Sequence, residues 1–112
     1  SRFSSCSSVK KSYKVDLIVK STSSEFWESV YDGAKAAGSN YNIDLRFLGP
    51  TKEKDYPLQV SIIEQSILHK QDAIILAAGD FNMMAEPVRM AVDAGIPVIL
   101  VDSGLNSDKW TS

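Results

Sequence analysis

Polar and aromatic side chains suited to binding a small ligand gather in three short segments of this 112-residue sequence. Residues 20–27 read Lys-Ser-Thr-Ser-Ser-Glu-Phe-Trp, residues 79–82 read Gly-Asp-Phe-Asn, and Asp102 precedes Ser103. A carboxylate accepts hydrogen bonds from paired hydroxyls, and an aromatic face packs on the C–H face of a sugar ring. These residue types favour the binding of a sugar or another polyol. The candidate ligand-binding residues are Ser24, Phe26, Trp27, Asp80, Asp102 and Ser103.

Three of these candidates have a structural alternative. Phe26 and Trp27 are adjacent, so on a helix their side chains diverge by about 100°. One of them can enter the core while the other faces a ligand, and core packing is the alternative role for Trp27. For Asp102 the alternative is that its carboxylate caps the following turn.

Catalytic motifs are missing from the sequence. The only histidine, His69, lies at an expected helix end, where interaction with the helix C-terminus explains it better than catalysis does. The glycine motifs of α/β-hydrolases, dinucleotide-binding folds and P-loops do not occur. A receiver domain needs acidic residues where this sequence has Lys20-Ser21-Thr22 and Ala77-Ala78. We therefore expect a binding protein rather than an enzyme, with no cofactor and no metal site.

Net charge and cysteine content exclude further classes. The formal net charge of -2 argues against a nucleic-acid partner, which usually requires a basic surface. The single cysteine, Cys6, excludes an internal disulfide framework and a cysteine-based zinc site. Two interpretations of Cys6 stay open: a free thiol in a serine-rich leader, or a lipid-modified cysteine near a mature N-terminus. No apolar run approaches the roughly 20 residues of a membrane span.

The ligand-binding candidates require a scaffold that brings them together, and the hydrophobic pattern predicts one. After a flexible leader over residues 1–12, strand and helix patterns alternate. We expect strands at 14–19, 44–48, 73–77 and 96–101 and helices at 24–37, 57–68 and 83–94. The predicted fold is α/β, an open parallel sheet of order 2-1-3-4 with helices on both faces. Parallel strands end at one edge, so the three polar segments meet there.

Local patterns give more specific expectations for the first helix and the second strand. Thr22 and Glu25 match a capping box, and Gly38 is expected to end the helix. The second strand alternates apolar with charged residues, which predicts an edge strand with one solvated side. The expected core stripe of the helix consists of Phe26, Val30, Gly33 and Ala37.

The last predicted strand has no helix after it. An outer strand with an uncovered apolar face is a poor end for a domain. We therefore expect the sequence to be an N-terminal portion of a longer protein.

Three runs together resemble ribose-type periplasmic sugar-binding proteins, which belong to the type I periplasmic binding proteins. Residues 19–34 resemble the first strand–helix unit of that family, with an aromatic pair followed by Asp32-Gly33-Ala34. Residues 73–78 and 94–102 are similar to its third and fourth strands. The resemblance covers nearly everything after the leader.

The resemblance implies a two-lobed extracytoplasmic receptor that closes on a ligand by hinge motion and passes it to an ABC permease. Residues 13–112 would form part of the N-terminal lobe. The family's ligand positions correspond to Ser24, Phe26, Trp27 and Asp102. A membrane-tethered sensor, or the effector domain of a lactose-repressor-type regulator, is the alternative.

Two positions differ from the residues common in that family, with Ser103 in place of arginine and Ala77 in place of asparagine. These differences leave open a different sugar, a larger glycan fragment or another polar metabolite.

Overall fold

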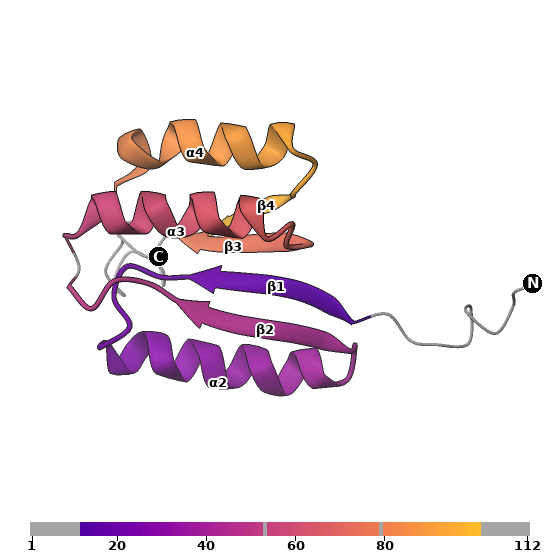
Figure 1. The fold of residues 1–112 in the computed structure, drawn as a ribbon. Coiled ribbons are helices and arrows are strands. Elements are labelled where there is room, and N and C mark those ends of the chain that lie inside the picture. Colours follow the sequence, from indigo (N-terminus) through magenta and orange to yellow (C-terminus); the bar gives the residue numbers. More distant parts are fainter. Residues whose placement is uncertain (1–11, 53, 79, 102–112) are drawn as a thin grey trace, which may run out of the picture.

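The computed structural model describes residues 12–52, 54–78 and 80–101. Three strands and three helices alternate before a final strand, as Figure 1 shows. The elements are β1 (Tyr13–Ile18), α2 (Glu25–Ser39), β2 (Ile43–Leu48), α3 (Tyr56–Leu68), β3 (Ala73–Ala77), α4 (Phe81–Asp93) and β4 (Val98–Val101). Among the predicted features, Cys6, Asp102, Ser103 and the leader up to residue 11 lie outside the described residues.

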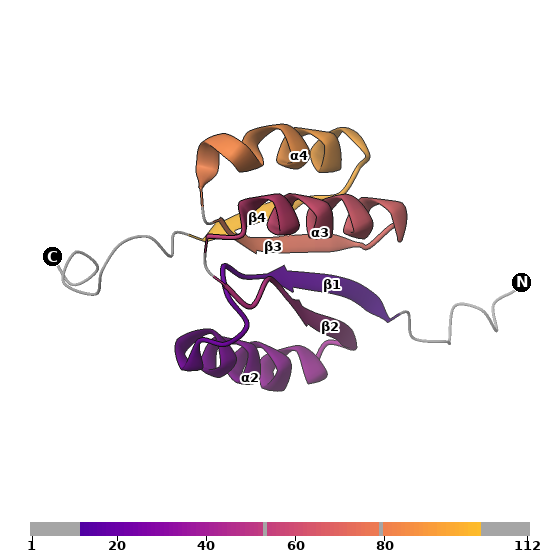
Figure 2. The same ribbon diagram turned by 60° about the vertical axis from the view of Figure 1, so that its left-hand side comes forward.

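The strands form one parallel sheet in the order β2-β1-β3-β4, which confirms the predicted topology. In the register of the central strands, Ile18 of β1 pairs with Leu48 on one side and Leu76 on the other. Helix α2 covers one face of the sheet, and α3 and α4 lie on the other (Figures 1 and 2). The chain therefore leaves β1 and β3 toward opposite faces, which makes their boundary the switch point of the sheet.

Alternation along the strands divides the core between the two faces of the sheet. On the face of α3 and α4, the buried side chains of Ile18 and Leu76 pack with Ile63 and Met84. On the face of α2, Leu17, Val19 and Ala77 pack with Trp27. The ends of β1 and β3 thus contribute to both halves of the core.

Helix α2 begins and ends slightly later than its sequence predicts. Its N-cap is Ser24 rather than Thr22, and the Ser24 side chain accepts a hydrogen bond from the Trp27 N–H at 3.5 Å. The predicted stop at Gly38 is wrong, because the helix continues to Ser39. Gly38 instead allows close packing, since an added Cβ there would lie 3.3 Å from the Cβ of Ile43.

Most of the predicted core stripe of this helix is also wrong by one position, Val30 being the exception. Phe26 is 63% exposed, whereas Trp27 is only 6% exposed. The inward-facing residues keep the predicted spacing but shift by one residue, because the larger indole of Trp27 fills the space over the strand ends. They are Trp27, Tyr31, Ala34 and Gly38, and Val30 of the predicted stripe packs against the same core.

Strand β2 lies at the edge of the sheet as predicted, but its charged side is not simply solvated. Arg46 forms a two-pronged ion pair with Asp16 of β1, at 2.8 Å from Nε to Oδ1 and 2.9 Å from Nη2 to Oδ2. Asp16 is completely buried and also accepts hydrogen bonds from Ser66 at 2.5 Å and Gln71 at 2.8 Å. One buried carboxylate therefore joins β1, β2, α3 and the loop between α3 and β3.

Burial, the strongest single influence, raises the pKa of Asp16, but the hydrogen bonds from Arg46, Ser66 and Gln71 and the charge of Arg46 together lower it further. The net pKa of Asp16 lies below its ordinary value. The pKa of Arg46 is raised by the same hydrogen bond and charge. The folded state thus favours the ionised carboxylate.

Candidate functional site

The loops that follow β1, β2 and β3 meet at the carboxyl edge of the sheet, toward which all strand arrows point in Figure 1. Their described residues are 19–24, 49–52, 54–55, 78 and 80. Ligands of open parallel sheets collect outside this edge, at the switch point. This edge is the candidate functional site.

The first two loops are tied together by hydrogen bonds. The hydroxyls of Ser21 and Ser23 each donate to the carbonyl oxygen of Thr51 at 3.0 Å. The backbone N–H of Thr22 donates to the carbonyl oxygen of Pro50 at 2.9 Å. The serine-rich segment of the first loop is therefore held by the second loop. The hydroxyls of Ser21 and Ser23 stabilise the contact between the two loops.

Close contact between these loops depends on Gly49. A Cβ added at Gly49 would lie 2.6 Å from the carbonyl oxygen of Val19, closer than such atoms approach in proteins. Glycine at this position lets the second loop lie directly against the end of β1.

Phe26 presents an aromatic surface beside the candidate site. It occupies the first turn of α2, two residues after the N-cap Ser24, and is 63% exposed. Its ring makes an edge-to-face contact with Trp27, with centroids 4.8 Å apart and an interplanar angle of 78°. The buried ring of Trp27 therefore packs against the exposed ring of Phe26 and limits its movement.

Trp27 itself belongs to the core in this structure. It packs on the face of α2 with Val19, which directly follows β1, and with Ala77, the last residue of β3. The packing alternative considered for Trp27 is thus shown, while contact of Trp27 with a ligand stays a prediction.

Asp80 caps helix α4. Its Oδ1 accepts hydrogen bonds from the backbone N–H groups of Asn82 at 2.8 Å and Met83 at 3.2 Å. This carboxylate therefore satisfies backbone donors at the helix start. A ligand role for Asp80 stays a prediction, as it does for Asp102 and Ser103 outside the described residues.

Gln59 of α3 is a residue of this edge that the sequence-based predictions do not include. It is 1% exposed, and its Nε2 donates to the carbonyl oxygens of Val19 and Ala77, each at 3.0 Å. Glutamine on a helix normally suggests a solvated side chain. A signal was present, because Gln59 shares the inward face of α3 with Ile63 and Ser66 at spacings of four and seven residues.

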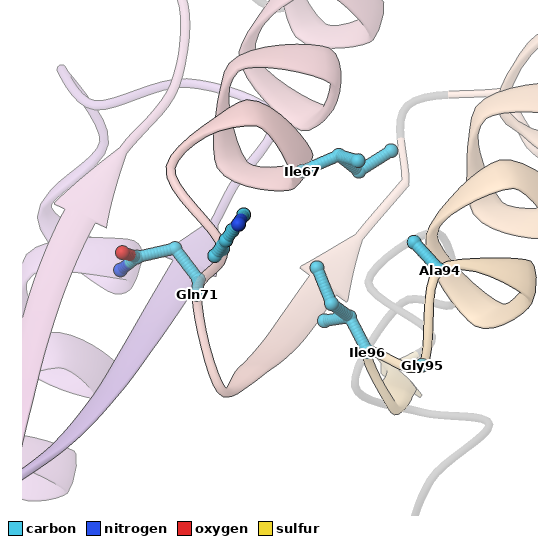
Figure 3. Close-up of a pocket in the computed structure, with 6 residues that line it drawn as sticks. Ile67, Gln71, Ala94, Gly95 and Ile96 are labelled. Carbon is cyan, nitrogen blue, oxygen red and sulfur yellow. The ribbon is translucent and has the colours of Figure 1, made fainter.

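A cavity of about 320 Å³ lies at the opposite edge of the sheet, between the C-terminal ends of α3 and α4 (Figure 3). It is lined by Ile67, Lys70, Gln71, Ala94, Gly95 and Ile96. The Gln71 side chain turns away from it toward β1, where it binds Asp16. This cavity is separate from the loops that carry the predicted ligand-binding residues.

Metal centres and membrane spans find no support in the part of the chain that the structure describes. Over 12–52, 54–78 and 80–101, no three His, Cys, Asp or Glu residues cluster as metal ligands would. Within the same ranges, every helix is too short or too polar to span a bilayer.

Comparison with known proteins places the chain in a family. Residues 15–111 match the model of a periplasmic binding protein domain. A D-ribose/D-allose-binding protein of Pseudomonas aeruginosa is 34% identical over 92 residues, which cover 80% of this chain and 29% of that protein. The chain thus spans less than a third of the length of this curated relative.

Solved structures give the same result. A carbohydrate transporter solute-binding protein from Agrobacterium radiobacter, in complex with D-arabinose, has a TM-score of 0.79 and 32% identity, covering 88% of this chain and 33% of that one. A sugar transporter from Clostridium phytofermentans has a TM-score of 0.74 and 38% identity, covering 88% of this chain and 36% of that one. Since the family model matches most of the chain and these folds agree, the chain belongs to the periplasmic binding protein family.

Proposed function

We propose that this chain is part of an extracytoplasmic solute-binding protein that binds a sugar or sugar-like polyol and delivers it to an ABC permease. The observation that carries the proposal is the exposed Phe26 ring at the carboxyl edge of the sheet, in a chain of the periplasmic binding protein family. An exposed aromatic ring held at a switch point suits the stacking of a sugar ring.

The relatives support a monosaccharide as the ligand class. One is named for D-ribose and D-allose, and two solved relatives contain D-arabinose and D-allose. In the proposed complex, Phe26 packs against the C–H face of the sugar, and Ser24 lies beside it. Trp27, Asp80, Asp102 and Ser103 complete the proposed set, with Asp102 accepting hydrogen bonds from sugar hydroxyls.

Transport is favoured over the alternatives of sensing and gene regulation. Three solved relatives that are at least 30% identical to this chain are described as a sugar transporter or as transporter solute-binding proteins. Under this proposal the protein has no catalytic role, its partner is a permease, and Cys6 is a candidate for lipid anchoring at the membrane surface.

Calorimetric titration of the full-length protein tests the proposal. The panel comprises D-ribose, D-allose, D-arabinose and D-fucose, with glycerol as a small polyol control. We expect saturable binding of at least one sugar, and proton NMR of the recovered sugar should show it chemically unchanged. Absence of binding across the panel contradicts the sugar proposal, and conversion of the sugar contradicts the absence of catalysis.

A further inference from the structure

We propose that Gln59 is a positioning residue for the ligand site, holding the carboxyl ends of β1 and β3 at a fixed separation. The inference rests on the proposed function, since it assigns to a buried helix residue a part in sugar affinity. Gln59 is buried on the α3 face of the sheet and is not a candidate for direct ligand contact.

The side chain of Gln59 joins the ends of β1 and β3 through two hydrogen bonds, and we call this arrangement the clamp. A glutamine amide nitrogen carries two N–H donors. In Gln59 this nitrogen donates to the carbonyl oxygen of Val19, directly after β1, and to that of Ala77, at the end of β3, each at 3.0 Å. A single side chain therefore sets the spacing between the two strand ends.

The clamp lies at the point where the pairing between β1 and β3 ends. The register between β1 and β3 ends with the pair Ile18 and Leu76, and Val19 and Ala77 are the next residues along. Beyond these two residues, the segments that follow β1 and β3 lead to opposite faces of the sheet, where α2 and α4 lie. Gln59 links the strands at the point where the loops diverge.

The clamp is connected to the exposed aromatic ring. Val19 and Ala77 pack with Trp27 on the opposite face of the sheet, and Trp27 contacts Phe26 edge to face at 4.8 Å. A change in the separation of Val19 and Ala77 would shift the surface against which Trp27 packs. The shift of Trp27 would in turn move the ring of Phe26.

Gln59→Met tests the clamp, because methionine is similar in length and has no N–H donor. In the full-length protein we expect this variant to bind its sugar, taken from the panel above, about tenfold more weakly, which corresponds to about 1.4 kcal/mol. Ser66→Ala is the matched control. It removes another buried polar group of α3, one that binds Asp16. We expect it to lower stability while its sugar affinity stays within about twofold of wild type.

Gln59→Glu gives a second readout that does not depend on the methionine variant folding. A protonated glutamic acid can donate one hydrogen bond to a carbonyl oxygen, whereas the ionised form can donate none. Two carbonyl oxygens nearby disfavour the ionised form. Burial also raises the pKa of a carboxyl group, so we expect the affinity of Gln59→Glu to recover in part, relative to wild type, when the pH is lowered from about 8 to about 5.5. Gln59→Met should show no such recovery.

The outcomes separate this inference from the proposed function. If the wild-type protein binds no sugar of the panel, the proposed function fails and the inference fails with it. If wild type binds a sugar and Gln59→Met binds it as tightly as Ser66→Ala does, the function stands and the positioning role is rejected. A flat pH profile for Gln59→Glu, matching wild type, also rejects it.

Discussion

Phe26 and Trp27 occupy different environments although they are adjacent in the sequence. Their divergence on a helix predicted that one would enter the core and the other face a ligand. The structure assigns the core position to Trp27 and the exposed position to Phe26. Periodicity could not decide between them, because stripes of identical spacing start from either residue. The phase of the helix is fixed by the fit of the indole against Val19 and Ala77.

Separate substitutions of the two aromatic residues should differ in their effect on stability. Phe26→Ala should change the free energy of unfolding by less than about 0.5 kcal/mol, because the ring is exposed. It should weaken sugar binding by about tenfold or more. Trp27→Ala should lower stability by about 3–5 kcal/mol, because it empties a core position.

Urea unfolding and calorimetric titration of both full-length variants measure these effects. Unchanged sugar affinity in Phe26→Ala would falsify the stacking role of that ring.

Asp16 shows what sequence alternation cannot reveal. Charged residues alternating with apolar ones predicted a solvated side for β2, but Arg46 turns toward the completely buried Asp16 of the adjacent strand. Only the three-dimensional pairing of β1 with β2, together with Ser66 and Gln71 above it, identifies the partners of this carboxylate.

Asp16→Asn should reduce stability in a pH-dependent manner. Since the pKa of Asp16 is lower in the folded protein than its ordinary value of 3.8, the ionised form stabilises the fold. This contribution is present in full above the unfolded-state pKa and is lost as the pH falls through the folded-state pKa. Arg46 remains partly solvated in the variant, so we expect a loss of about 2 kcal/mol near neutral pH.

Denaturant unfolding at about pH 7 and about pH 3 measures this loss, and the difference between wild type and Asp16→Asn should shrink in acid. A difference that stays constant across this range would show that the charge of Asp16 does not stabilise the fold.

At the scale of elements, the loops of the candidate site are positioned by contacts between chain segments far apart in the sequence. The strand following α3 was predicted at residues 73–77 and is found there, because a continuous apolar run identifies a strand covered on both faces. The hydrogen bonds from Ser21 and Ser23 to Thr51 could not be predicted, since they depend on how two loops meet.

Gly49→Ala should disturb the contact between those loops. The new Cβ would collide with the backbone of Val19, so we expect a loss of stability of about 1–3 kcal/mol and weaker sugar binding. Gly33→Ala is the control, because a Cβ added there would meet no side chain or neighbouring segment within 4 Å. In the middle of α2 this alanine should raise stability by about 0.5–1 kcal/mol.

Thermal and denaturant unfolding of the two glycine variants provides the comparison. Equal effects of the two substitutions would contradict the close approach at Gly49.

Substitutions of Asp80, at the start of α4, distinguish its role as a helix N-cap from a role in ligand binding. Asparagine is as good an N-cap as aspartate, whereas alanine is not, so Asp80→Ala should lose about 1 kcal/mol and Asp80→Asn should remain close to wild type. If Asp80 also binds the sugar through its charge, Asp80→Asn should weaken binding while stability holds. Loss of stability in Asp80→Asn equal to that in Asp80→Ala would contradict the capping geometry.

At the scale of the whole molecule, the sheet order and the placement of helices on both faces followed from the sequence. Alternating strand and helix patterns with right-handed crossovers leave few possible arrangements. The candidate site was predicted less completely. The loops after β1 and β3 lie at one edge of the sheet, as predicted. The sequence does not show that a helix glutamine, Gln59, reaches across two strand ends at that edge.

The central claim is that a sugar binds at the carboxyl edge of the sheet, and hydrogen–deuterium exchange of the full-length protein tests it most directly. Exchange is measured with and without whichever sugar of the panel binds. The account predicts slower exchange in residues 20–27 and 78–82 on binding. Protection confined to residues 67–71 and 94–96, around the cavity at the opposite edge, would contradict it.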